Sequence, residues 1–197
     1  RVNARRTDLQ AETQRVELGL AERLRERGFA VEVGYRPAVT DEDDAGEVDL
    51  ICHLDGALLL LEVKSGYIRS TRHEVWLHRT NTLRKAAWQL RRKQVAVCSA
   101  LMTDLELRAR LGYNGHEPGT DVCAWIVDTS IELDGQWIDG YRIVSREVLE
   151  VILRDEKRFL RRMDQDDDGR VSLFPDGFSF GRFVEVVETD QLWRSLC

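Results

Sequence analysis

Residues 46–66, GEVDLICHLDGALLLLEVKSG, form the most strand-like stretch of the chain. Two apolar runs flank Asp55-Gly56, and an Asp-Gly pair in such a setting is a strong signal for a two-residue hairpin turn. Charged residues interrupt both runs, although charged side chains are rarely buried without partners. These residues are Glu47, Asp49, Glu62 and Lys64. Their places in the hairpin therefore decide what this stretch can do.

A two-residue turn fixes which residues of the hairpin face each other. Counting outward from the turn places Asp49 opposite Glu62, and Glu47 opposite Lys64. Side chains alternate between the two faces of a strand, so the charges share one face, at the end remote from the turn. The other face is wholly apolar, with Val48, Leu50, Cys52, Leu54, Ala57, Leu59, Leu61 and Val63.

The facing carboxylates of Asp49 and Glu62 indicate a metal site. Directly opposed side chains have Cβ atoms about 5 Å apart, and like charges at that distance are destabilising. A divalent cation removes this cost, and Mg²⁺ is commonly held by one or two carboxylates. Lys64 lies on the same face, where its ammonium can reach a metal-bound water or a phosphate. The alternative is an edge hairpin with surface ion pairs, which explains Glu47 and Lys64 but not the facing acids.

Length and composition indicate an ordinary globular protein. A chain of 197 residues with 43% hydrophobic and 32% charged residues is expected to form one domain with a sizeable core. It has no apolar run of about 20 residues, the length of a membrane span. Its N-terminus does not resemble a secretory signal, and its four cysteines form no CxxC pair. We therefore expect a cytoplasmic protein with reduced thiols. Because the chain does not begin with Met, a longer parent chain stays open.

Positive charge is concentrated in residues 64–94. This segment holds nine basic residues and one acid, in a chain whose net charge is −6. Such a block is a plausible footprint for a polyanion, and the alternative is a solvated helix face. The residues expected to contact nucleic-acid phosphates are Arg69, Arg72, Arg79, Arg84, Lys85 and Lys93.

Hydrophobic spacing and turn signals predict a mixed sheet flanked by helices. Ser145 is predicted to cap the helix that follows it. The predicted helices are 8–27, 81–112 (as one helix or two) and 146–163. The predicted strands are 29–37, the two arms of the hairpin, 121–133 and 141–145. Residues 164–197 are expected to form turns and short strands.

The hairpin residues resemble the core motif of the PD-(D/E)XK nuclease superfamily. That motif has an Asp on one strand and Glu-x-Lys on the next, here Asp49 and Glu62-Val63-Lys64. The usual Pro before the Asp is absent, and Val48 stands there. The stretch is especially similar to the nuclease-related-domain and Holliday-resolvase-like branches.

Two further residues agree with this resemblance. Such families often carry a Glu on the first helix, for which Glu17 is preferred over Glu12 and Glu22. Many also carry a Gln on the helix after the Lys strand, and Gln89 matches it. The resemblance implies a restriction-endonuclease-like three-layer α/β core over residues 8–160. Residues 161–197 would then be a small C-terminal extension of strands and an acidic turn, packed on the same domain.

The resemblance also implies an activity, namely Mg²⁺- or Mn²⁺-dependent hydrolysis of phosphodiester bonds, most readily in DNA. Asp49, Glu62, the Val63 carbonyl and Glu17 would bind metal. Lys64 would position or activate the attacking water, and Gln89 would help hold the backbone. The rival is a catalytically inactive nuclease-fold module that binds nucleic acid or protein. A homodimer, or fusion to other modules, stays open.

Several other motifs are assigned structural roles. Asp164, Asp166, Asp168 and Gly169 lie where an EF-hand loop begins, but Pro175 stands where a bidentate Glu is required. We therefore expect an acidic turn there rather than a Ca²⁺ site. Trp76 and Trp88 are expected in the core or at its rim rather than stacked on bases. His53 lies on the charged face nearer the turn and is expected to be structural. His73 and His78 lack a partner at metal-ligand spacing, so they are expected to be phosphate contacts or surface residues rather than metal ligands.

Overall fold

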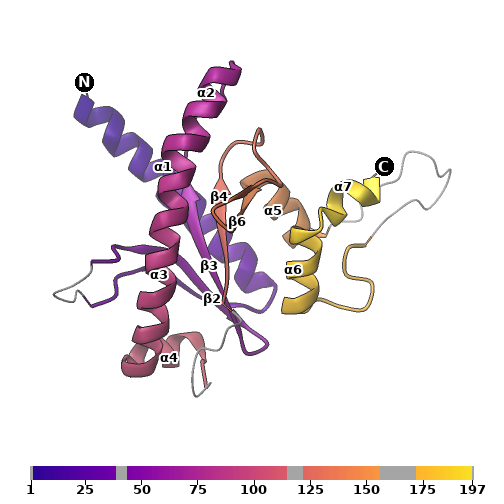
Figure 1. Cartoon of the computed structure of the whole chain (residues 1–197). Helices are drawn as coiled ribbons and strands as arrows, with labels where there is room; N and C mark the ends of the chain where they lie inside the picture. Colours follow the sequence, from indigo (N-terminus) through magenta and orange to yellow (C-terminus); the bar gives the residue numbers. More distant parts are fainter. Residues whose placement is uncertain (1, 39–43, 115–121, 156–171, 197) are drawn as a thin grey trace.

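The structure is a computed structural model that describes residues 2–38, 44–114, 122–155 and 172–196. A central mixed sheet lies between two layers of helices (Figure 1). The strands are β1 (Ala30–Tyr35), β2 (Val48–Leu54), β3 (Ala57–Lys64), β4 (Val122–Asp128), β5 (Trp137–Ile138) and β6 (Tyr141–Ser145). The helices are α1 (Val2–Glu26), α2 (Arg72–Leu77), the π-helical η1 (His78–Leu83), α3 (Arg84–Thr103), α4 (Leu105–Leu111), α5 (Arg146–Arg154), α6 (Phe180–Glu188) and α7 (Gln191–Leu196).

The sheet has the strand order β1-β2-β3-β4-β6-β5. Strands β1 to β3 form an antiparallel meander, β4 runs parallel to β3, and β6 runs parallel to β4. The hairpin register is confirmed, because Leu54 pairs with Ala57 and the turn is Asp55-Gly56. Both turn residues have positive φ, 53° and 80°, as a type I′ turn requires. The alternative of an edge hairpin is wrong, since β2 and β3 are both interior strands.

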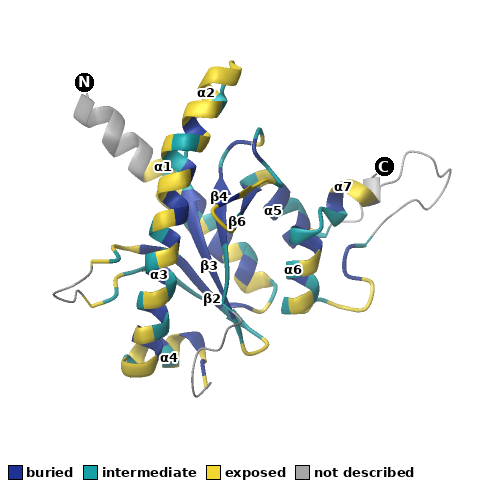
Figure 2. Cartoon of the chain, viewed as in Figure 1, coloured by how far each residue is buried: buried dark blue, intermediate teal, exposed yellow. Residues whose placement is uncertain are grey.

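The two faces of the sheet bury separate apolar clusters, which appear dark blue in Figure 2. One lies under α1, α5 and α6, and includes Leu50 and Leu61 of the predicted apolar face. The other lies under α3 and α4. Val48 is an exception to the prediction, because it packs in the second cluster together with its strand partner Tyr35. Gly34, with φ +67°, breaks the regular alternation of β1 beside this pair.

The helical region after the hairpin begins earlier than predicted. α2, η1 and α3 follow one another without a break, so that a helical rod extends over residues 72–103. A capping box between Thr71 and Glu74 starts this rod. Asp104 ends it and caps α4, because its Oδ1 accepts hydrogen bonds from two backbone N–H groups. The predicted cap of α5 is confirmed, since Val148 N donates to Ser145 Oγ.

The prediction of C-terminal strands is wrong, because the described residues there form α6 and α7. Phe183, Val186 and Val187 have helical spacing and are buried in the cluster under α1. Burial of this stripe outweighs the strand preference of valine and phenylalanine. The calcium-loop-like Asp164, Asp166 and Asp168 lie outside the described residues. Within the part of the chain that is described, no helix is long and apolar enough to cross a membrane.

Candidate catalytic site

The acidic residues of the hairpin lie where the pairing between the interior strands β2 and β3 ends. Asp49 and Glu62 come directly beyond Leu50 and Leu61, the last pair of the β2–β3 register. Asp49 Oδ2 accepts a hydrogen bond from the Val63 backbone N at 2.7 Å. Lys64 Nζ donates to Glu62 Oε1 at 2.6 Å. Glu62 is only 1% exposed whereas the Lys64 side chain is partly exposed, so the carboxylate is buried and the ammonium reaches solvent.

Lys93 of α3 completes the site, in a place that differs from the expectation of an exposed phosphate contact. The residue is 3% exposed, and its Nζ donates to Asp49 Oδ1 at 3.3 Å and to Glu62 Oε2. One ammonium therefore bridges the two facing carboxylates. A sequence signal for this position exists, because Lys93 lies on the apolar stripe of α3 between Leu90 and Val97.

Burial and the neighbouring charges shift the pKa values of Asp49 and Lys93. Burial, and then repulsion from Glu62, raise the pKa of Asp49 above its ordinary value. Burial works against the charge of Lys93, yet the carboxylates of Asp49 and Glu62 raise the pKa of its ammonium above the ordinary value. The Lys93 ammonium between the two acids thus offsets their repulsion.

Helix α1 adds Glu17 to this group. The Glu17 side chain is half-buried, and burial, followed by repulsion from Asp49 and Glu47, raises its pKa to about 7. A carboxyl group with that pKa exchanges protons near neutral pH. Glu12 and Glu22, the two competitors on the same helix, are both exposed. The preference for Glu17 therefore agrees with the position of α1 over the hairpin.

Gln89 lies on the side of α3 that carries Lys93, as expected for a residue near the site, whereas Glu47 does not make the ion pair considered for it. Gln89 is half-buried on α3, four residues before Lys93 and therefore on the same side of the helix. Glu47 does not pair with Lys64 in the structure. Its carboxylate instead binds Arg36, with 2.8 Å between Nη2 and Oε2, because the other edge of β2 lies against β1.

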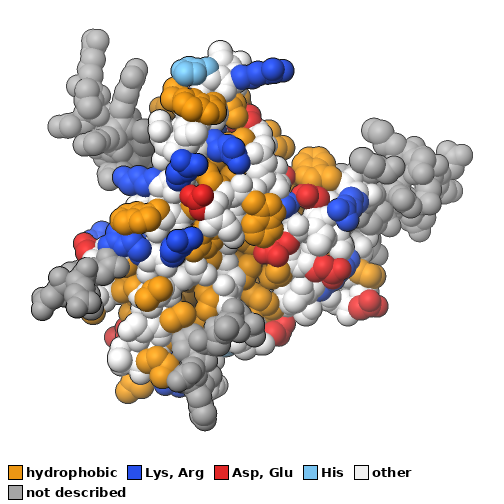
Figure 3. Space-filling view, in the orientation of Figure 1, with side chains coloured by type: hydrophobic (Ala, Val, Ile, Leu, Met, Phe, Trp, Pro, Cys, Tyr) orange, Lys and Arg blue, Asp and Glu red, His pale blue; other side chains and the backbone are white. Residues whose placement is uncertain are grey.

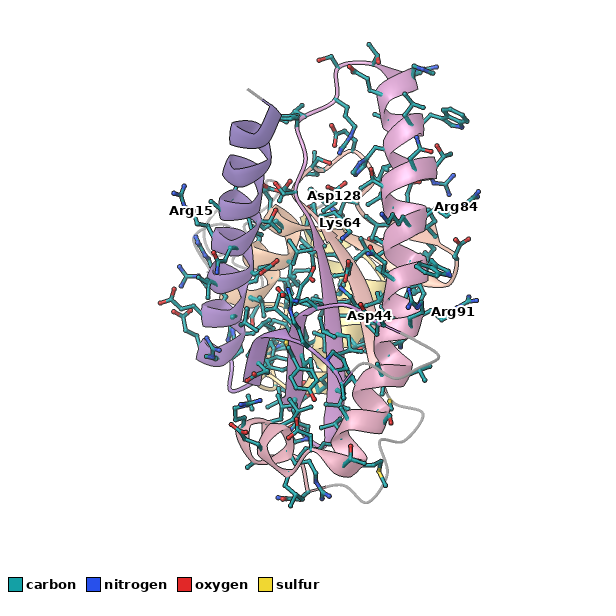
Figure 4. The ribbon with its side chains drawn as sticks, turned by 90° about the vertical axis from the view of Figure 1, so that its left-hand side faces the viewer. Arg15, Asp44, Lys64, Arg84, Arg91 and Asp128 are labelled. Carbon is teal, nitrogen blue, oxygen red and sulfur yellow. The ribbon has the colours of Figure 1, made fainter. Side chains whose placement is uncertain are left out.

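Most of the basic block lies on the rod formed by α2, η1 and α3, and Figure 3 shows Lys and Arg side chains among apolar ones over this part of the surface. Arg72, Arg79, Arg84 and Lys85 are exposed. Figure 4 shows that Arg84 points away from the strands, whereas Lys64 lies between α1 and the rod. These cations therefore do not all belong to one surface.

Arg69 is the second departure from the expected phosphate contacts. Its guanidinium donates to Ser130 at 2.5 Å and lies 3.8 Å from Asp128 and 3.6 Å from Glu132. Its side chain is mostly buried by these partners. Its charge is thus used largely within the protein.

The donor set fits a hard cation. Carboxylate oxygens of Asp49 and Glu62 converge on the Lys93 ammonium, which marks the position where these acids accept positive charge. Among the described residues no three His, Cys, Asp or Glu side chains are grouped as ligands. Mg²⁺ does not require such a group, since it usually keeps several waters and takes one or two carboxylates.

Comparisons of the chain with protein-family models, with curated proteins and with solved structures find no match. The site is therefore interpreted from its own geometry and chemistry.

Proposed function

We propose that the chain is a divalent-metal-dependent nuclease of the PD-(D/E)XK type, with a restriction-endonuclease-like core, that hydrolyses phosphodiester bonds in DNA. The observation that carries the proposal is the convergence of Asp49 and Glu62 on one buried cation, with Lys64 on the same strand end. The order helix, three antiparallel strands, helix, parallel strand supports it. So does the basic rod beside the site.

Each side chain has a role that follows from its place. Asp49 and Glu62, with the Val63 carbonyl and Glu17, would hold Mg²⁺ or Mn²⁺. When bound, the metal lowers the pKa of a water ligand and offsets charge on the phosphate. Lys64 is partly exposed, so its ammonium can orient the attacking water and bind the phosphate. Gln89 and the exposed arginines of the rod would hold the nucleic-acid backbone, largely without reading sequence.

Lys93 has a role that the resemblance does not supply. Its ammonium offsets the negative charge of Asp49 and Glu62. A divalent cation bound to these carboxylates would take the place of part of that contact. We assign it as a positioning residue that keeps the acids paired and ionised. Glu17, with its pKa raised to about 7, can accept a proton near neutral pH.

The same observation favours a second candidate function. If Lys93 satisfies both acids permanently, the chain is a catalytically inactive nuclease-fold module that binds nucleic acid. The two candidates make opposite predictions about metal. A nuclease needs Mg²⁺ at the carboxylates, whereas the inactive module is indifferent to it.

The deciding experiment is cleavage of plasmid, single-stranded and branched DNA, and of RNA, in Mg²⁺ and in EDTA. Asp49→Asn and Lys64→Met, each checked for folding by its melting temperature, should lower the Mg²⁺-dependent rate by at least about 100-fold, the scale of one lost transition-state contact. The matched control is Asp139→Asn, which changes an exposed carboxyl in the β5–β6 turn. Full activity in both site variants would contradict the assignment. A folded wild-type protein that binds DNA but cleaves nothing would favour the inactive module.

A further inference from the structure

We infer that the groove between residues 65–71 and α2 binds single-stranded nucleic acid, with an unpaired base stacked on Trp76. Binding of a single strand in the groove does not depend on the proposed function. Only the statement that this strand is the substrate of the candidate catalytic site rests on it. It assigns the substrate a single-stranded segment next to the bond that is cut.

The groove has a volume of about 480 Å³ and lies where the chain leaves β3 and enters α2. Its lining includes Arg69, Arg72, Val75, Trp76, Arg79 and Glu132. Lys64 is the last residue of β3, so the groove begins a few residues beyond the proposed site. A strand that occupies the groove can therefore continue towards Lys64.

Trp76 is exposed in a way that the fold does not require. It is 57% exposed, and α2 contains no buried residue, so the side chain contributes little to the core. Of the two positions expected for this residue, the core is therefore excluded, and the rim is left. The ring stacks on His73, with 6.0 Å between centroids and an interplanar angle of 19°. This contact orients the ring, and an exposed aromatic ring is the usual platform for an unpaired base.

The charges of the groove suit phosphates. Arg72 and Arg79 lie on either side of Trp76 in the sequence, and both are exposed. Within the described part of the chain, neither forms an ion pair. An aromatic ring between two cations matches a strand whose bases alternate with phosphates. A negatively charged protein segment would match the arginines but would leave the indole without a specific partner.

Buried hydrogen bonds hold the base of the groove in place. His78, the first residue of η1, forms a 2.7 Å contact with Asp128 at the end of β4, and Ser130 donates to the same Asp128 oxygen at 2.9 Å. Arg69 donates to Ser130 in turn. Asp128 pairs with Lys64 in the sheet register, and Figure 4 shows the two side by side. A groove held in this way is preorganised next to the site. The π-helical η1 at its base agrees with a functional role, because π-helical turns are frequent at functional sites.

A blunt duplex does not present what the groove can bind. Its base faces are covered by their neighbours, so only a frayed end or a single-stranded segment offers a face to Trp76. The test is fluorescence anisotropy of a labelled oligothymidylate in EDTA, with oligouridylate and a blunt duplex of mixed sequence as the other arms. Because EDTA removes the metal, binding is measured independently of cleavage.

Trp76→Ala should weaken single-strand binding by about 5- to 150-fold, the range measured for the loss of one stacked base. Trp76→Phe should restore most of it. The matched control is Trp88→Ala, because Trp88 is 56% exposed on the same rod but contacts Arg92 and lies outside the groove lining. Tighter binding of either the DNA or the RNA strand than of duplex, together with the Trp76 effect, supports the inference and identifies the polymer.

Equal effects of the two tryptophan substitutions, or duplex binding at least as tight as single-strand binding, would overturn the inference. So would binding of an anionic protein in place of nucleic acid. The outcome is separable from that of the proposed function. Trp76-dependent binding without cleavage would support the single-strand groove and contradict the proposed nuclease. Cleavage of blunt duplex that is insensitive to Trp76→Ala would support the nuclease and contradict the groove.

Discussion

Replacing Lys93 by methionine removes the ammonium between Asp49 and Glu62 while keeping an unbranched chain of similar length. Both acids are then left buried with Lys64 as their nearest remaining cation, 2.6 Å from Glu62. Asp49 keeps its hydrogen bond from Val63 N but loses its ion pair. The substitution therefore leaves carboxylate charge without compensation, unless a metal supplies it.

The expected loss of stability follows from the burial of this group. The side chains of Lys93, Glu62 and Asp49 are 4%, 1% and 14% exposed. Removing one partner of a buried ion pair costs about 3–5 kcal/mol. Since Lys64 remains on Glu62, we expect the lower end, about 3 kcal/mol. For a chain of this size that corresponds to a fall in melting temperature of about 6–12 °C.

Divalent metal should reverse most of this loss. A ligand at about 100 times its dissociation constant stabilises the folded state by about 2.7 kcal/mol. In the variant the Lys93 ammonium no longer competes for the carboxylates, so Mg²⁺ should raise its melting temperature more than that of the wild type. The difference in melting temperature between the variant and the wild type should also narrow in acid. Protonation of Asp49, whose pKa is raised, removes the uncompensated charge there.

The assay is thermal denaturation in EDTA and in a Mg²⁺ titration, with circular dichroism to check the fold. Lys85→Met is the matched control, since Lys85 is exposed on the same helix and its loss should change stability by no more than about 0.5 kcal/mol. If Lys93→Met melts with the wild type in EDTA, the ammonium does not hold the acids. If Mg²⁺ leaves the gap unchanged, these acids do not bind the metal.

Three further substitutions test other parts of the structure. A raised pKa favours folding only while the carboxyl is protonated, so the wild type should lose stability as pH rises from about 4.5 to about 7. Glu17→Gln should reduce that loss in urea titrations, leaving the part due to the raised pKa of Asp49, and exposed Glu22→Gln should not; parallel curves for Glu17→Gln and the wild type would contradict the raised pKa of Glu17. Gly56→Ala, at φ +80° with no atom within 4 Å of the added Cβ, should lower the free energy of unfolding by about 1–2 kcal/mol through backbone strain alone. Gly19→Ala inside α1 should raise it by up to about 1 kcal/mol. Equal effects of the two substitutions would argue against the positive-φ turn. His78→Ala should lower the free energy of unfolding by about 1–3 kcal/mol, because the buried carboxylate of Asp128 loses one of its hydrogen-bond partners; an unchanged melting temperature would contradict this.

Local sequence rules were sufficient for the central hairpin. Asp55-Gly56 adopts the two positive φ angles that a two-residue turn requires, and this fixes the register of every pair in β2 and β3. The same rules failed for α6, where valines and phenylalanines form a helix. Strand preference there is a weak local tendency, and it is outweighed by the apolar cluster under α1 that the stripe completes.

The pairing of β2 with β3 from the turn to Leu50 and Leu61, which brings Asp49 close to Glu62, was determined by the sequence alone, because a two-residue turn leaves no other register. The partner that makes this closeness tolerable was decided by the tertiary structure. Lys93 is 31 residues beyond Glu62, and only the packing of α3 across the sheet brings its ammonium to the two carboxylates. The exposure of Trp76 likewise depends on where α2 leaves the core. Strand pairing is a short-range geometric rule, whereas helix-to-sheet contact depends on how the whole chain buries its apolar surface.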